Sequence, residues 1–318
     1  MSEKEIEALQ KNARRWNRAA SVLFAVVWLG LTAALLAFSL YVSAQEGISL
    51  QLELIAASVT LPLVAAFGLY LLLYFLFVRW HYDRFNRAFK EKYVLQTLQA
   101  AGGFESLRYD PSRGFSYQEV WDSCVVATGE QKYFKSEDLL LGSFQGIPFA
   151  YCDVVTESLR RRGKRSRVET IFEGQILRFS LPEGSKWSFG HLQIFEKELL
   201  SNLKGRTAPH KIQVEHEGFN RRFQVFAADE HNAFYLLTPQ MLEQIVQFAD
   251  AAGCQIALTF VGPYLYVAMN SRRSMFDASV KEPFDKQRQA ILADAGLMRR
   301  AGELLVLEAD LLAQRERT

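Results

Sequence analysis

The chain has 318 residues, with 37 Lys and Arg against 35 Asp and Glu, so its formal net charge is only +2. This balance argues against a protein that binds nucleic acid through bulk charge and against an acidic disordered tail. Eight prolines, nineteen glycines and 13% aromatic residues exclude collagen-like and globally disordered chains. Three widely spaced cysteines predict neither a disulfide framework nor a metal motif, and they suit a reducing compartment.

Two long uncharged stretches dominate the first quarter of the chain. Residues 19–44 and 54–78 contain no charged side chain, and as helices both exceed the roughly 30 Å hydrocarbon core of a bilayer. We therefore expect two transmembrane helices joined by an extracytoplasmic loop at 45–53. Small residues four apart, such as Gly30 and Ala34, permit close helix packing, either within this hairpin or between copies in a homo-oligomer. The absence of charged residues argues against a channel or transporter.

Basic residues flank the two spans on their outer sides, and the loop between the spans has none. Such residues stay on the cytoplasmic side of a membrane, so the basic tail at 1–18 and the C-terminus are both predicted to be cytoplasmic. Trp16, Trp80 and Tyr82 lie where aromatic rings meet the headgroups, which supports the proposed ends of the spans.

The remaining chain predicts a different kind of structure. Residues 79–103 indicate a juxtamembrane helical stalk that ends at two glycines. Residues 104–280 contain short aromatic and β-branched runs separated by turn residues, which predicts a strand-rich, mainly antiparallel α+β domain. Strands are expected at 133–134, 143–155, 168–179, 211–215, 223–227 and 254–269.

One helix and one hairpin are predicted in detail within this domain. Thr238 can cap the first free amides of a helix that starts with Pro239, and Gly253 suits its end. Residues 255–268 then predict a β-hairpin that turns at Gly262.

Residues 281–318 predict an amphipathic C-terminal helix. Apolar residues recur every seven positions from Phe284 to Leu312, which makes a continuous apolar stripe. The stripe is expected either to pack on the same chain or to bind a partner. Gly296 and Gly302 are places where the helix could break, because each costs about 1 kcal/mol relative to Ala.

The short motifs of catalysis and cofactor binding are missing. The five histidines form no metal-ligand spacing, and there is no phosphate-binding Gly-rich loop and no GxSxG elbow. The sequence therefore predicts no catalytic, cofactor or metal residue. The alternative is an enzyme that acts on a lipid or membrane-associated substrate, with Glu173, His216 and Asp229 as polar candidates at expected strand ends.

A basic cluster is the most distinctive local feature. Its six residues are Arg160, Arg161, Arg162, Lys164, Arg165 and Arg167. Without them, residues 93–318 carry 21 basic against 28 acidic side chains. We expect an exposed loop that contacts anionic lipid headgroups or a membrane-protein partner, or else a merely solvated hairpin tip. No aromatic residue interleaves the cluster, which makes nucleic acid an improbable ligand.

Spaced short motifs carry a resemblance to a known family. They are Tyr-Phe at 133–134, Thr-Ile-Phe-Glu-Gly at 170–174, Phe-Gln-Val-Phe at 223–226, Ala-Phe-Tyr-Leu-Leu-Thr-Pro at 233–239 and Tyr-Leu-Tyr-Val-Ala at 264–268. With the two spans, the chain up to about Ser271 resembles the bacterial family known as domain of unknown function 3137. The resemblance implies a bacterial inner-membrane protein with a cytoplasmic domain, and it supplies no catalytic residues. The expected function is a membrane-anchored, non-catalytic binding or regulatory module.

Overall fold

The computed structural model divides into two compact units and describes residues 2–46, 52–162, 165–180, 189–200, 203 and 206–315. The helical unit comprises Met1–Tyr93 and Ala278–Phe284, and the sheet unit comprises Val94–Asp277 and Asp285–Thr318. The short segment Ala278–Phe284 therefore belongs with the N-terminal helices although it lies late in the sequence.

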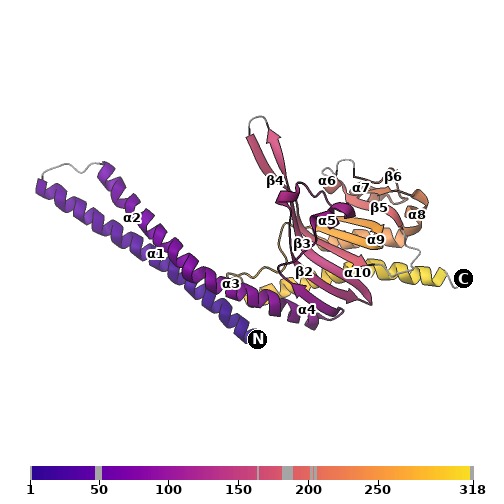
Figure 1. Ribbon diagram of the computed structural model, residues 1–318, viewed down its shortest axis with the longest axis horizontal. Coiled ribbons are helices and arrows are strands. Elements are labelled where there is room, and N and C mark those ends of the chain that lie inside the picture. Colours follow the sequence, from indigo (N-terminus) through magenta and orange to yellow (C-terminus); the bar gives the residue numbers. More distant parts are fainter. Residues whose placement is uncertain are drawn as a thin grey trace. The chain divides into compact units, whose positions relative to one another are not determined.

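Long helices make up the helical unit. They are α1 (Glu3–Glu46), α2 (Leu52–Leu73), the π-helical η1 (Tyr74–Val78), α3 (Arg79–Ala88) and the π-helical η2 (Phe89–Val94), whose last residue lies in the sheet unit. Helices α1 and α2 lie side by side (Figure 1), where the Ser39 and Ser58 hydroxyls are 3.2 Å apart. The rings of Phe24 and Tyr70 meet edge to face at 5.7 Å.

Two helices are long and apolar enough to cross a membrane. Large apolar side chains cover their outer surfaces, and Val22, Phe38 and Leu61 are each more than 60% exposed. Gly30 and Ala34 are also exposed, so these small residues do not form the contact between α1 and α2. Their expected use within the hairpin is therefore wrong.

The late segment Ala278–Phe284 is tied to the N-terminal helix by hydrogen bonds. The Gln10 amide donates to two of its carbonyl oxygens at 2.8 and 2.9 Å, and Arg14 Nε donates to a third at 2.9 Å. The Phe284 ring packs on Tyr93 with 4.4 Å between centroids. Arg14 thus has a structural role in addition to its place in the basic flank.

The sheet unit is built on a nine-stranded sheet whose pairings are all antiparallel (Figure 1). The strand order is β1-β2-β3-β4-β9-β8-β5-β7-β6. The strands are β1 (Glu105–Asp110), β2 (Lys135–Phe144), β3 (Ile147–Arg162), β4 (Arg165–Ser180), β5 (Phe189–Glu196), β6 (His210–Ile212), β7 (Phe223–Ala227), β8 (Gln255–Gly262) and β9 (Tyr264–Asn270). This confirms an α+β fold with an antiparallel sheet.

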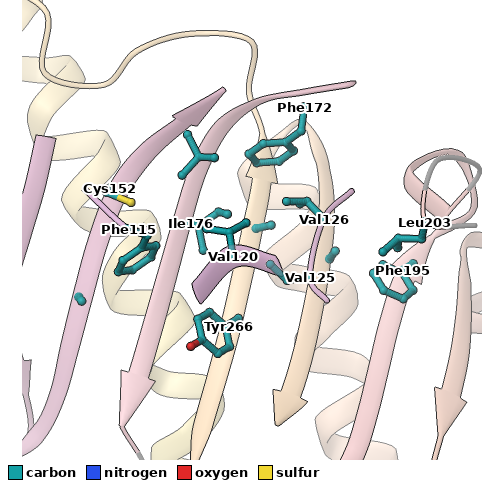
Figure 2. Close-up of a cluster of buried hydrophobic side chains, with 14 residues drawn as sticks. Phe115, Val120, Val125, Val126, Cys152, Phe172, Ile176, Phe195, Leu203 and Tyr266 are labelled. Carbon is teal, nitrogen blue, oxygen red and sulfur yellow. The ribbon is translucent and has the colours of Figure 1, made fainter. Parts of the chain in front are cut away.

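Helices pack on both faces of the sheet. They are α4 (Leu95–Ala101), α5 (Tyr117–Ser123), the 3-10 helix η3 (Gln131–Tyr133), α6 (Lys197–Leu200), α7 (Glu217–Arg222), α8 (Glu230–Leu236), α9 (Pro239–Ala252) and α10 (Phe284–Arg315). Val120 of α5 lies among Cys152, Ile176 and Tyr266 of the sheet in the apolar cluster of Figure 2. Helix α10 packs on the opposite face, where Gly302 lies against the Phe144 ring.

The structure confirms the elements that the sequence predicts from their capping and turn residues. The Thr238 hydroxyl accepts a hydrogen bond from the Met241 amide at 3.2 Å, and Gly253 ends α9 with a φ of 61°. Strands β8 and β9 form the expected hairpin, in which Gly262 has a φ of 54°. The predicted stalk is helical through α4 and ends at Gly102 with a φ of 70°.

Polar strands were harder to predict. The strand expected at 133–134 is instead the end of η3, while β1, most of β2 and β5 were not expected at all. Strand β2 carries charged residues, and its pairing with β3 shifts register between Glu137 and Leu140. This irregularity puts Asp138 at a φ of 62° and breaks the apolar alternation that would identify a strand.

The C-terminal helix packs on its own chain over the part whose side chains are described. Ile291, Met298 and Leu304 on its apolar stripe are buried. The helix continues without a break through Gly296 and Gly302. Close packing accounts for the second glycine, because a Cβ there would lie 2.5 Å from Phe144 Cδ1.

The two glycines of α10 should therefore respond oppositely to alanine. Gly296→Ala should raise the free energy of unfolding by up to about 1 kcal/mol, because no atom lies within 4 Å of the added methyl group. Gly302→Ala should lower it by about 1–3 kcal/mol, because the methyl group overlaps a buried Phe144 ring. Chemical denaturation of the purified variants measures both changes, and equal stabilisation by both would contradict this packing.

Candidate functional site

The basic cluster lies at the far end of the β3–β4 hairpin. Arg160 and Arg161 end β3 together with Arg162, while Arg165 and Arg167 begin β4. Lys164 lies outside the described residues, as do the side chains of Arg162 and Arg165. The cluster was expected in a loop, and that expectation is wrong, because strand pairing continues to the Arg162–Arg165 pair.

The hairpin projects beyond the sheet as a two-stranded arm, residues 157–170 (Figure 1). The last β2 partner of β3 is Val155, and the last β9 partner of β4 in this direction is Gln175. Between these pairs and the arm, the register shifts at Thr156, where β4 contains one extra residue. Such a bulge bends a strand and increases its twist, which directs the arm away from the sheet.

The base of the arm is held by a neighbouring segment. The Glu130 amide donates to Glu157 O at 3.0 Å, and the Leu159 amide donates to a Glu130 carboxylate oxygen at 3.2 Å. Hydrogen bonds from Lys132 and from the Leu159 amide lower the pKa of Glu130. A Cβ at Gly129 would lie 2.1 Å from Glu157 O, so only glycine permits this approach.

Like charges face each other across the arm. Arg160 pairs directly with Arg167, and the same register pairs residues 162 and 165. Arg160 forms a 2.6 Å ion pair with Glu169. Within the described residues, Arg167 has no carboxylate at ion-pair distance. Directly opposed like charges destabilise a strand pair, so the pairing of Arg160 with Arg167 does not itself stabilise the hairpin.

The other face of the arm is partly apolar. Leu159 pairs with Val168, and the Val168 side chain is 38% exposed. Successive side chains of a strand point to opposite faces, so this pair lies opposite the face of Arg160 and Arg167. The arm therefore combines a basic face with an apolar pair in which Leu159 is half-buried and Val168 is exposed.

The polar candidates for an enzyme have separate structural roles. His216 accepts a hydrogen bond from the Phe219 amide at 2.9 Å and caps α7. Asp229 accepts from the His231 amide at 2.8 Å and caps α8. Glu173 lies on β4. Among the described pockets, none is lined by more than one of these three residues.

A buried polar network on the α10 face of the sheet centres on Asp153. Its carboxylate accepts hydrogen bonds from the Ser274 hydroxyl at 2.7 Å, the Met275 amide at 2.9 Å and Gln175 Nε2 at 3.1 Å. Burial raises the pKa of Asp153 to about 6, although these hydrogen bonds act in the opposite direction. The network fixes the chain just after β9.

A second buried carboxyl belongs to α10. Asp294 is fully buried, and its Oδ1 accepts a 2.5 Å hydrogen bond from Arg273 Nη2. Burial raises the pKa of Asp294 to about 6, and Arg273 opposes this shift. Sequence reasoning missed both carboxyls. Their positions in the sequence could have indicated that they are buried. Asp153 interrupts an apolar strand, and Asp294 lies three residues after Ile291 on the apolar stripe.

Part of the chain matches a known protein family. Residues 170–304 match a family described as protein of unknown function (DUF3137), which is the family that the sequence motifs resemble. The match extends beyond Ser271 into α10, and it does not include the Tyr-Phe motif at 133–134. Neither the curated proteins nor the solved structures yielded a match.

Acid should stabilise the wild-type chain relative to Asp294→Asn. The folded-state pKa of about 6 exceeds the ordinary value of 3.8, so the stability linked to protonation is complete below about 4 and is lost as pH rises through 6. Between pH 7.5 and 4.5, roughly, the wild type should gain on the order of 2 kcal/mol over the variant. Chemical denaturation across this range measures the difference, and parallel pH profiles would contradict a raised pKa.

Proposed function

We propose that this protein is a membrane-anchored, non-catalytic binding or regulatory module. The exposed apolar surfaces of α1 and α2 support the anchor, because water-facing surfaces of this extent are rare and lipid chains would cover them at little cost. Both helices exceed the length needed to cross a bilayer. The hydroxyl contact between Ser39 and Ser58 also supports pairing of two spans.

The proposed orientation rests on the basic flanks. Arg14, Arg15 and Arg18 precede the first apolar stretch, and Arg79 and Arg84 follow the second. The positive-inside rule then favours a multi-pass protein with both termini in the cytoplasm, and the family resemblance favours the bacterial inner membrane. The sheet unit would share that compartment, since it follows the second span.

The observation that carries the binding role is the pairing of Arg160 with Arg167 on an arm whose opposite face carries the half-buried Leu159 and the exposed Val168. Basic and apolar side chains together suit a membrane surface, where a basic residue near anionic lipid contributes about 1 kcal/mol. We propose that the arm contacts anionic headgroups of the membrane that anchors the chain. An acidic membrane-protein partner is the alternative that the test below separates.

The orientation predicts which sites a membrane-impermeant maleimide can reach in intact cells. A cysteine introduced at position 49, in the loop between the spans, should react. A cysteine introduced at Ser166, which is exposed on the arm, should react only after lysis, because the reagent cannot cross the membrane. Mass spectrometry of the labelled peptides measures both, and the reverse pattern would contradict the orientation.

The arm should approach lipid only when the membrane is anionic. The full chain, labelled with an environment-sensitive fluorophore at Ser166→Cys, is reconstituted in nanodiscs of zwitterionic lipid or with about one-third anionic lipid. Brominated lipid should quench the fluorophore only in the anionic discs, and salt of about 0.5 M should remove the effect by screening.

Matched variants separate the arm from general surface charge. Changing Arg160, Arg161 and Arg167 to Gln should abolish the quenching. Changing three exposed arginines elsewhere in the sheet unit, Arg108, Arg113 and Arg221, should leave it intact. Equal quenching in both lipid mixtures, or equal loss in both variants, would exclude headgroup binding by the arm and favour a protein partner.

A further inference from the structure

A small pocket lies on the α10 face of the sheet unit, away from the arm. It has a volume of about 140 Å³ and lies where the end of α9, the chain after β9 and α10 meet. Its polar lining includes Gln175, Cys254, Ser271, Arg273 and Asp294. Sites for drug-sized ligands are typically 300–1,000 Å³, so this pocket admits only a small molecule or group.

One atom of the lining lacks a hydrogen-bond partner. Asp294 is fully buried, and while its Oδ1 accepts from Arg273, its Oδ2 is buried without a donor within the described structure. A buried polar atom left unpaired costs about 1–3 kcal/mol, and more if it is charged. A donor placed in the pocket would remove that cost.

Two side-chain donors of the pocket wall, those of Gln175 and Ser271, are already engaged elsewhere. Gln175 Nε2 donates to Asp153 at 3.1 Å and to Arg273 O at 2.6 Å. The Ser271 hydroxyl donates to the same Arg273 oxygen at 3.2 Å. A donor on a molecule that enters the pocket would therefore satisfy Asp294 Oδ2 without breaking these bonds.

The electrostatics of the pocket favour a positively charged donor. The Arg273 guanidinium balances the Asp294 carboxylate. Helix α9 then adds its negative C-terminal end, since Ala252 and Gly253 line the pocket and its last turn has no basic residue. Within the described chain no three His, Cys, Asp or Glu side chains come together, so a divalent metal lacks a ligand set.

We infer that this pocket binds a small primary ammonium group, which donates a hydrogen bond to Asp294 Oδ2. An ammonium group supplies three N–H donors and one positive charge. Because the pKa of Asp294 is about 6, the carboxylate is mostly ionised at neutral pH and can accept. This site is independent of the proposed membrane contact, and its residues lie within the family match at 170–304.

Cys254 offers a direct readout of occupancy, because it lines the pocket and is half-buried. The full chain in nanodiscs is treated with N-ethylmaleimide at about pH 8, since burial raises the pKa of this thiol. Methylammonium chloride, on the order of 100 mM, should slow alkylation of Cys254 several-fold if its Kd is in the tens of millimolar, roughly. Cys124, also half-buried but outside the pocket, should react at an unchanged rate.

Two comparisons decide the inference. Tetramethylammonium at equal ionic strength has the charge but no N–H donor, so it should give no protection. Asp294→Asn should lose the protection, while Asp285→Asn, an exposed change on the same helix, should retain it. Equal protection by both cations, protection that survives Asp294→Asn, or no protection by methylammonium would overturn the inference. The cation comparison on the wild type decides it even if a variant fails to fold.

Discussion

The antiparallel pairing of β3 with β4 is the constraint on which the rest of the sheet unit depends. Each strand has 16 residues, which is about 50 Å of extended chain. Strand β2 leaves β3 at Val155, and β9 leaves β4 at Gln175, so the inner part is shared with the whole sheet. The outer part consists of β3 and β4 alone and begins after the bulge at Thr156. One ladder thus supports both a core and a projecting arm.

The inner part of this ladder also determines the buried polar network. Asp153 lies directly opposite Gln175, so the register itself brings a carboxylate to an amide that can donate to it. A slip of one residue would turn both side chains to the other face of the sheet. Their bonds to Arg273, Ser274 and Met275 fix the chain after β9, which forms one wall of the ammonium pocket. These hydrogen bonds, in addition to the apolar packing of the sheet, hold this wall in place.

The sequence was informative where local chemistry decides the structure. The cap at Thr238, the left-handed glycine at Gly253 and the turn at Gly262 depend on neighbouring residues only, and all three are confirmed. The basic residues of the arm lie in strands because the inner ladder continues into them, and no local pattern of charged residues shows that. Asp294 joins Arg273 across 21 positions, a pairing that only the tertiary fold creates.

The family match bears differently on the two proposed sites. It begins at Thr170, after the last basic residue of the arm, Arg167, and it contains the pocket from Gln175 to Leu297. The match therefore covers the residues that form the pocket but gives no support to the arm, which depends on its own register and charge. The arm needs a surface with many negative charges, whereas the pocket needs one donor group aimed at one oxygen atom. Each proposal can fail while the other stands, since they share the β3–β4 ladder but neither a ligand-binding side chain nor a ligand.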